Sequence, residues 1–156
     1  QTYNQPALIE EFIAGSEYTV VVLGNGSARA FPPVQILIQG MRDLGEEFYT
    51  SERVYNQDIG SVCPDDLPES FVSELSTMAI NAYHALGCRD FGRVDFRVDK
   101  DNKPYFLELN PLPNISQSDV FPLVAEKSGM TYHQIIQTIL RHALHRYNLF
   151  SEAVCE

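Results

Sequence analysis

At 156 residues, the chain is long enough for one domain with a sizeable buried core. Its formal net charge of −10 argues against a broad surface for nucleic acid or for anionic membranes, because both need clustered Lys and Arg. Cys63, Cys88 and Cys155 contain no CxxC pair and predict neither a disulfide framework nor a zinc site, which fits a reducing cytoplasm. No apolar run approaches the roughly 18 residues of a membrane span. We therefore expect an acidic cytoplasmic protein that binds neither nucleic acid nor membrane.

Three short β-rich runs open the chain. They span residues 7–13, 17–24 and 28–38 and read ALIEEFI, EYTVVVLG and ARAFPPVQILI. Asn25-Gly26 lies between the second and third runs and is a signal for a two-residue hairpin turn. The runs predict three antiparallel strands. Because the chain starts with Gln and enters a strand pattern almost at once, we expect it to be the C-terminal piece of a longer protein.

The middle and end of the chain predict one long loop and three helices. Residues 39–67 show little periodicity, which indicates a loop of functional or mobile character. A helix is predicted from Pro68 to a stop at Gly87, a shorter one over about 120–128, and a last one after a Thr131–Gln134 capping box. The apolar residues at helical spacing in the first of these are Phe71, Leu75, Met78, Ala79, Ala82, Tyr83 and Leu86. Together the elements predict an α+β domain over residues 1–147, with a mostly antiparallel sheet and helices on one face, and a polar tail over residues 148–156.

The stretch VDFRVDKDNKPYFLELN reads as a β-hairpin that carries acidic groups on one face. If residues 101–102 form a two-residue turn, opposed residues have numbers that sum to 203. Asp95 then lies opposite Glu108, and Arg93 lies opposite Asn110. The apolar residues that alternate with them fall on the other, buried face: Val94, Phe96, Val98, Tyr105, Leu107 and Leu109.

Two directly opposed carboxylates repel each other and need a cation between them. Three interpretations of Asp95 and Glu108 stay open on the residues alone. Arg93 and Arg97 neutralise them in an ordinary surface charge ladder, or the two carboxylates and the amide oxygen of Asn110 hold Mg²⁺. Alternatively, they are the paired carboxylates of a glycoside hydrolase.

A family resemblance, carried by the order of motifs, favours the magnesium interpretation. GRVDF, followed by YFLELNPLP and SDVFPLVAEKSGMTYHQII, resembles the C-terminal half of the ATP-grasp fold, and specifically the D-alanine:D-alanine ligase group. Upstream, LIEEFIAGSEYTVVVLG resembles the hinge strand of that group and the strand after it, so the resemblance covers residues 6 to 145. It implies an ATP-grasp C-terminal subdomain of an ATP-dependent carboxylate-amine ligase, in which an acyl phosphate forms and the amine attacks it.

The resemblance also implies what must accompany this chain. The small-molecule partners are a carboxylate and an amine. The group's phosphate-binding lysines and Gly-rich loop precede the first residue here, so a missing N-terminal part of the same protein is expected to complete the site, and the isolated chain is expected to be inactive. Members of the group commonly form dimers, which makes a homodimer a further expectation.

For the nucleotide, the resemblance implies a binding set near the start of the chain. Glu10 would accept from the adenine amino group, the backbone near Phe12 and Ile13 would complete the base-binding hinge, and Leu107 would join the cofactor site. Glu17 would accept from the ribose hydroxyls, since an ionised carboxylate is an acceptor only. Without the resemblance, these glutamates read as solvated charges on strands.

For the phosphates, the resemblance assigns the acidic face of the hairpin. Asp95, Glu108 and Asn110 would hold two Mg²⁺ ions, with Mn²⁺ as a substitute, that bridge the terminal phosphates of ATP. Arg93 would act in catalysis by contacting the transferring phosphate and the acyl phosphate oxygens.

The sequence departs from the group's pattern in three places. Asn114 replaces a Gly whose amide helps bind the oxyanion, and Asp119 replaces a Ser that helps bind the carboxylate of the second D-alanine. Either neighbouring Ser118 serves instead, or the amine substrate is not a simple D-amino acid or carries a cationic group. The long loop lacks the group's Lys-Tyr pair, for which Arg53 and Tyr55 are the nearest substitutes. A catalytically idle nucleotide-binding or scaffold module of the same fold is therefore the alternative function.

Overall fold

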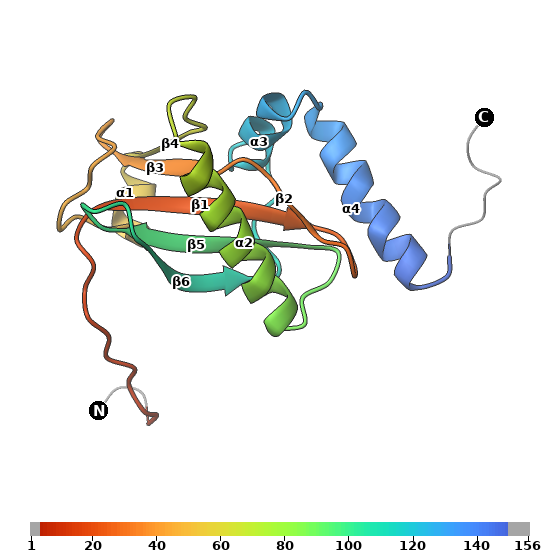
Figure 1. Cartoon of the computed structure of the whole chain (residues 1–156), viewed down its shortest axis with the longest axis horizontal. Helices are drawn as coiled ribbons and strands as arrows, with labels where there is room; N and C mark the ends of the chain where they lie inside the picture. The colour runs from red at the N-terminus through yellow and green to blue at the C-terminus, as the bar shows by residue number, and fades with distance from the viewer. Residues whose placement is uncertain (1–3, 150–156) are drawn as a thin grey trace.

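The computed structural model describes residues 4–149 (Figure 1). In this part of the chain, six strands form one sheet of order β4-β3-β1-β5-β6, with β2 paired to β1, and every pairing is antiparallel. The strands are β1 Ser16–Leu23, β2 Arg29–Ala30, β3 Val34–Ile38, β4 Ile59–Val62, β5 Phe91–Val98 and β6 Pro104–Asn110. The helices are α1 Ser51–Tyr55, α2 Glu69–Ala85, α3 Phe121–Lys127 and α4 Tyr132–Arg146. The predicted α+β class and the mostly antiparallel sheet are confirmed.

Helix α2 covers one face of the sheet. Its buried residues Phe71, Leu75, Ala79 and Tyr83 pack against every second residue of β1 and β5. The tyrosine also donates a hydrogen bond of 2.9 Å from its hydroxyl to the carbonyl of Gly24. Burial of each large apolar side chain contributes about 1.5–3 kcal/mol, so this layer is the main core.

Helices α3 and α4 pack on the opposite face, at the C-terminal end of β1. There Val21 and Leu23 contact the cluster that contains Phe121, Val124 and Ile135. The prediction that all helices lie on one face was therefore wrong. The reason is that the run VVVL leaves β1 apolar on both faces at this end, and both faces then need cover. The N-terminal half of β1 alternates instead, and its uncovered face carries polar groups.

The strand predictions near the N-terminus need correction. Residues 7–13 form no strand, because they lie along no sheet edge in the described chain, and Leu8 and Ile9 are exposed. The third run divides into β2 and β3 at Pro32-Pro33, which cannot donate to a ladder. The turn before β2 takes five residues rather than two, since Leu23 pairs with Arg29.

The long predicted loop contains two short elements. Helix α1 begins after Thr50, whose hydroxyl accepts from the N–H of Arg53. Strand β4 pairs with β3 and forms an edge of the sheet. Both were missed because neither is long enough to show a period. Within residues 4–149, no helix is both long and apolar enough to cross a bilayer.

The β5–β6 hairpin keeps the predicted pairs and changes the turn. Arg93 pairs with Asn110 and Asp95 with Glu108, as expected, but Val98 pairs with Pro104 across a loop of residues 99–103. A β-bulge beside Asp95 absorbs the difference. As a result Leu107 leaves the buried face and is 45% exposed, whereas the ring of Phe106 contacts Phe96 edge to face.

The C-terminal helices agree with the sequence. Helix α3 falls within the predicted range, and α4 opens with the predicted capping box of Thr131 and Gln134. Of the predicted polar tail, residues 150–156 lie outside the described residues, together with residues 1–3 of the predicted domain.

Candidate functional site

A cleft of about 850 Å³ opens on the sheet face opposite α2. Residues of β1, β3, β5 and β6 form its floor, and its walls include residues 11–13, 48–49, Asn114 and residues 118–120. The predicted site residues that line it are Phe12, Ile13, Glu17, Arg93, Asp95, Leu107, Glu108, Asn114, Ser118 and Asp119. Glu10 is exposed outside this lining, and Glu11 lines the cleft instead. The fold thus gathers residues that are up to about a hundred positions apart in the sequence.

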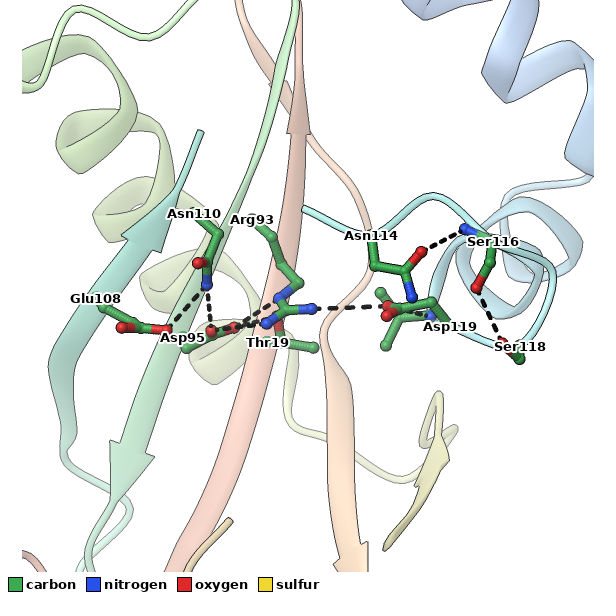
Figure 2. Close-up of polar contacts among 10 residues, drawn as sticks. Thr19, Arg93, Asp95, Glu108, Asn110, Asn114, Ser116, Ser118 and Asp119 are labelled. Atoms are coloured by element: carbon green, nitrogen blue, oxygen red, sulfur yellow. Dashed lines mark hydrogen bonds and ion pairs between the residues drawn. The ribbon is translucent and has the colours of Figure 1, made fainter. Parts of the chain in front are cut away.

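Asp95 accepts hydrogen bonds from three side chains in the cleft (Figure 2). It is buried, and its Oδ1 accepts from the Thr19 hydroxyl at 2.5 Å and from Nε of Arg93 at 3.1 Å. Its Oδ2 accepts from Nη2 of Arg93 at 3.1 Å and from the amide of Asn110 at 3.0 Å. These donors fix the position of the carboxylate in the floor of the cleft.

Glu108 and Asp95 accept hydrogen bonds from the same side-chain amide, that of Asn110. The Asn110 amide nitrogen also donates to Oε1 of Glu108, at 3.0 Å. Glu108 is exposed, so the two opposed carboxylates differ in environment although they share one face. The surface-ladder interpretation fails for Arg97, which is buried and contacts neither acid.

Arg93 connects the hairpin to the loop before α3. Besides Asp95, its Nη1 lies 3.6 Å from Oδ1 of Asp119 (Figure 2). Burial alone would lower the pKa of Arg93, but the two carboxylates raise it above its ordinary value. The guanidinium therefore stays charged, as the predicted contact with a phosphate requires.

The loop before α3 is organised by its own side chains. Oδ1 of Asn114 accepts from the N–H of Ser116 at 2.9 Å, and the hydroxyls of Ser116 and Ser118 lie 2.9 Å apart. Oδ1 of Asp119 accepts from the N–H of Val120 at 2.7 Å. Asn114 does not adopt the left-handed backbone angles that a glycine would permit, so its side chain rather than its φ angle shapes this turn.

Glu17 is buried at the other end of the cleft. Burial raises the pKa of this carboxyl, and the Arg97 guanidinium, 3.6 Å away, opposes that rise. The hairpin pattern did not indicate that Arg97 would be buried beneath the cleft, because charged residues are almost never fully buried unless they are paired.

Tyr49 is one of several cleft residues that the sequence did not single out. It lines the cleft, and burial raises the pKa of its hydroxyl while the nearby Arg93 opposes that rise. The loop substitutes predicted from the sequence lie elsewhere: Arg53 pairs with Glu47, and Tyr55 is exposed. No periodic signal could have distinguished Tyr49 from Tyr55.

The donor chemistry fits a hard cation. Within residues 4–149, no cluster of three or more His, Cys, Asp or Glu is present, so a cation would depend on two carboxylates and an amide. Mg²⁺ needs only one or two carboxylates in proteins and completes its shell with water and phosphate. Rotation of the Asn110 amide would present its oxygen where its nitrogen now joins Asp95 and Glu108.

Residues 1–141 match the family described as D-ala D-ala ligase C-terminus. The chain belongs to this ligase family. It is 37% identical over 143 residues to a D-alanine–D-alanine ligase of Bordetella petrii. The aligned residues cover 90% of this chain and 42% of the relative. A D-alanine–D-alanine ligase of Ruthia magnifica is 34% identical, over 88% of this chain and 44% of the relative. The chain thus spans less than half the length of the relatives that it matches.

Solved structures agree with this ligase family. The D-alanine-D-alanine ligase from Coxiella burnetii has a TM-score of 0.71 at 26% identity, over 89% of this chain and 34% of that one. The D-alanine–D-alanine ligase from Bacillus anthracis, complexed with ATP, has a TM-score of 0.68 at 24% identity, over 89% and 41% of the two chains. The predicted fold, that of the C-terminal part of these ATP-grasp ligases, is confirmed.

Proposed function

We propose that this chain is the C-terminal ATP-grasp subdomain, residues 1–147, of an ATP-dependent ligase that joins a carboxylate to an amine. The observation that carries the proposal is the pair Asp95 and Glu108, brought together on facing strands beside Arg93 in the cleft of about 850 Å³. Less than half of a relative's length is present, so we propose that a preceding part of the same protein supplies the remaining phosphate contacts.

The nucleotide is proposed to lie along the cleft, with its base beside residues 11–13. Arg97 already donates a hydrogen bond to the carbonyl of Ile13, so we expect the N–H of Ile13 to bind the base. Glu17 is the buried acceptor for the ribose hydroxyls. Leu107, which the bulge turns into the cleft, offers apolar area to the nucleotide.

The phosphates are proposed to lie over the acidic hairpin face. Asp95, Glu108 and Asn110 would hold two Mg²⁺ ions, or Mn²⁺ in their place, and these ions offset negative charge on the terminal phosphates when bound. A substrate carboxylate oxygen bonds to the γ-phosphorus as the bond to ADP breaks, which gives an acyl phosphate. The amine then attacks the acyl carbon, the carbon–nitrogen bond forms as the bond to phosphate breaks, and inorganic phosphate and a proton from the amine leave. Arg93 stabilises the negative charge that develops in both steps.

The identity of the substrates rests on the loop before α3. The names of the relatives make D-alanine the first compound to test. Asp119, however, pairs with Arg93 and would repel the carboxylate of an amino-acid nucleophile. The Ser118 hydroxyl lines the cleft and is free of that repulsion. We therefore propose a carboxylate and an amine as the substrate classes.

The test is ADP release by the full-length protein that contains this chain. Mg-ATP is supplied with D-alanine alone and with pairs drawn from D- and L-amino acids, amines and hydroxy acids. Glu108→Gln keeps the size of the side chain and removes its charge. We expect release to require one acid and one amine, and to fall by roughly 10²-fold or more in the variant.

Two results would contradict this function. Mg-ATP binding without ADP release for any pair would favour the idle nucleotide-binding module. Release that Glu108→Gln leaves unchanged would show that the hairpin carboxylate takes no part in the chemistry. The matched control is Glu74→Gln, an exposed acid on α2 that lies outside the cleft and should leave release unchanged.

A further inference from the structure

Arg97 lies on β5 directly opposite Glu17 of β1 and is only 3% exposed. The N–H groups of a buried guanidinium need hydrogen-bond acceptors, because burying a charge without partners greatly destabilises the folded state. Four backbone carbonyls accept from it: Ile13 at 2.9 Å, Gly15 at 3.1 Å, Gly45 at 3.0 Å and Glu47 at 3.1 Å.

These carbonyls belong to two irregular segments that the sequence separates by about thirty residues. One is residues 13–15, just before β1, and the other is residues 45–47, in the connection between β3 and α1. They also bond to each other, since the N–H of Gly15 donates to the carbonyl of Gly45 at 2.8 Å. The Arg97 guanidinium therefore fastens both segments to the sheet at one point.

The contacts of Arg97 extend into the cleft. Its guanidinium carbon lies 5.3 Å from the centre of the Phe12 ring, within the range of a cation–π contact. Gly15 passes so close to β5 that an added Cβ would lie 2.1 Å from the carbonyl oxygen of Val98. The segment 45–47 leads directly to Phe48 and Tyr49, which line the cleft.

We propose that Arg97 is a positioning residue for the nucleotide end of the cleft, which it holds in shape by joining residues 12–15, residues 45–47 and the Glu17 carboxylate. The proposal rests on the proposed function, because residues 12–13 and Glu17 are the groups assigned to the base and the ribose. A role in folding alone would not require an arginine, since apolar residues often replace buried ion pairs without loss of stability. An apolar side chain cannot orient four carbonyls, whereas the planar fork of arginine can.

The experiment uses the full-length protein that contains this chain, with Arg97→Met, Arg97→Lys and the control Arg146→Met. Arg146 also pairs with a well-buried aspartate, Asp90, but it lies outside the cleft. Mg-ATP affinity is measured by calorimetry, and the KM values for ATP and for the two other substrates are measured by ADP release.

We expect Arg97→Met to weaken Mg-ATP binding and to raise the KM for ATP by about tenfold, the equivalent of one lost hydrogen bond. The KM values of the other substrates should stay within about twofold, because they bind at the far end. Arg97→Lys keeps the charge beside Glu17 but not the fork, so its ATP affinity should also fall. Arg146→Met should lower thermal stability without changing the KM for ATP.

Three results would overturn the proposal. Wild-type ATP affinity in Arg97→Met would show that the carbonyls need no guanidinium. If Arg97→Met does not fold, wild-type affinity in Arg97→Lys would show that charge alone suffices. A wild-type protein that does not bind Mg-ATP would overturn both this proposal and the proposed function. Binding without ADP release, by contrast, overturns only the ligase function, and the affinity comparison still decides the role of Arg97.

Discussion

The environment of each acid in the cleft depends on its neighbours more than on its position in the hairpin. Asp95 and Glu108 are paired across the strands, yet Asp95 is buried among three donors and Glu108 is exposed. The difference comes from β1, which brings Thr19 against Asp95, whereas β6 has no strand on its outer side. Asp95 is therefore the fixed partner of the pair, and Glu108 is the adaptable one.

Thr19→Val tests this arrangement at the scale of one hydrogen bond. The substitution removes the hydroxyl that donates to Asp95 and keeps the shape of the side chain. We expect the Mg²⁺ concentration needed for half-maximal ADP release to rise about tenfold, because groups that orient a ligand set commonly matter by that amount. Thr77→Val, on the exposed face of α2, is the control. An unchanged Mg²⁺ requirement would mean that the threonine does not orient Asp95.

Periodicity located α2 correctly but overstated its buried face. The predicted limits, Pro68 and Gly87, lie at the two ends of the helix, where proline is the N-cap and glycine follows the C-cap residue. Leu86, however, continues the apolar pattern and is 62% exposed. Leu86 is the C-cap residue, one position beyond the last helical residue Ala85, and it does not belong to the core cluster beneath α2.

Leu75→Ala and Leu86→Ala separate pattern from packing in α2. Leu75 is fully buried, so its truncation should lower the free energy of unfolding by about 2–5 kcal/mol. Truncation of Leu86 should lower the free energy of unfolding by about 0.5 kcal/mol or less, because this side chain already contacts solvent. Denaturant unfolding of both variants measures the difference. Equal losses would show that the last turn of α2 packs as the sequence pattern predicts.

At the scale of the whole molecule, α4 is joined to the sheet by one polar cluster outside the cleft. Arg146 donates to Asp90, with the closest pair at 2.6 Å, and the Asn25 amide donates to the same carboxylate at 2.8 Å. These contacts, led by the Arg146 hydrogen bond, lower the pKa of Asp90. The carboxylate thus contributes stability that is present above its unfolded pKa and is lost as the pH falls through its lowered folded pKa.

Asp90→Asn is expected to lower the melting temperature at neutral pH and to have less effect in acid. The difference from the wild type should shrink as the pH falls through the lowered pKa of the folded carboxylate, where the native state loses this charge. Melting curves from pH 7 to pH 2 follow the change. A difference that stays constant with pH would show that the loss comes from packing rather than from the charge of Asp90.

The sequence by itself determined the elements that carry a local signal and the pairing of the β5–β6 hairpin at Arg93 and Asp95. Proline, glycine and the Thr131 capping box act within a few residues, and the alternation of β5 leaves one register with a buried apolar face. The ordered motifs then indicated the family, and the resemblance to that family singled out Asp95, Glu108 and Arg93 as candidate site residues. These features depend on residues that are close together in the sequence, so they can be predicted from the sequence.

Only the tertiary structure decided which groups meet. The bulge that turns Leu107 into the cleft restores a register that the turn had shifted, and nothing within β6 requires it. Tyr49 lines the cleft and Tyr55 does not, because the connection after β3 is fastened at residues 45–47 to Arg97. The burial of Arg97 depends in turn on carbonyls from two distant segments. Such contacts depend on the path of the backbone in three dimensions, and residue type and spacing along the chain do not indicate that path.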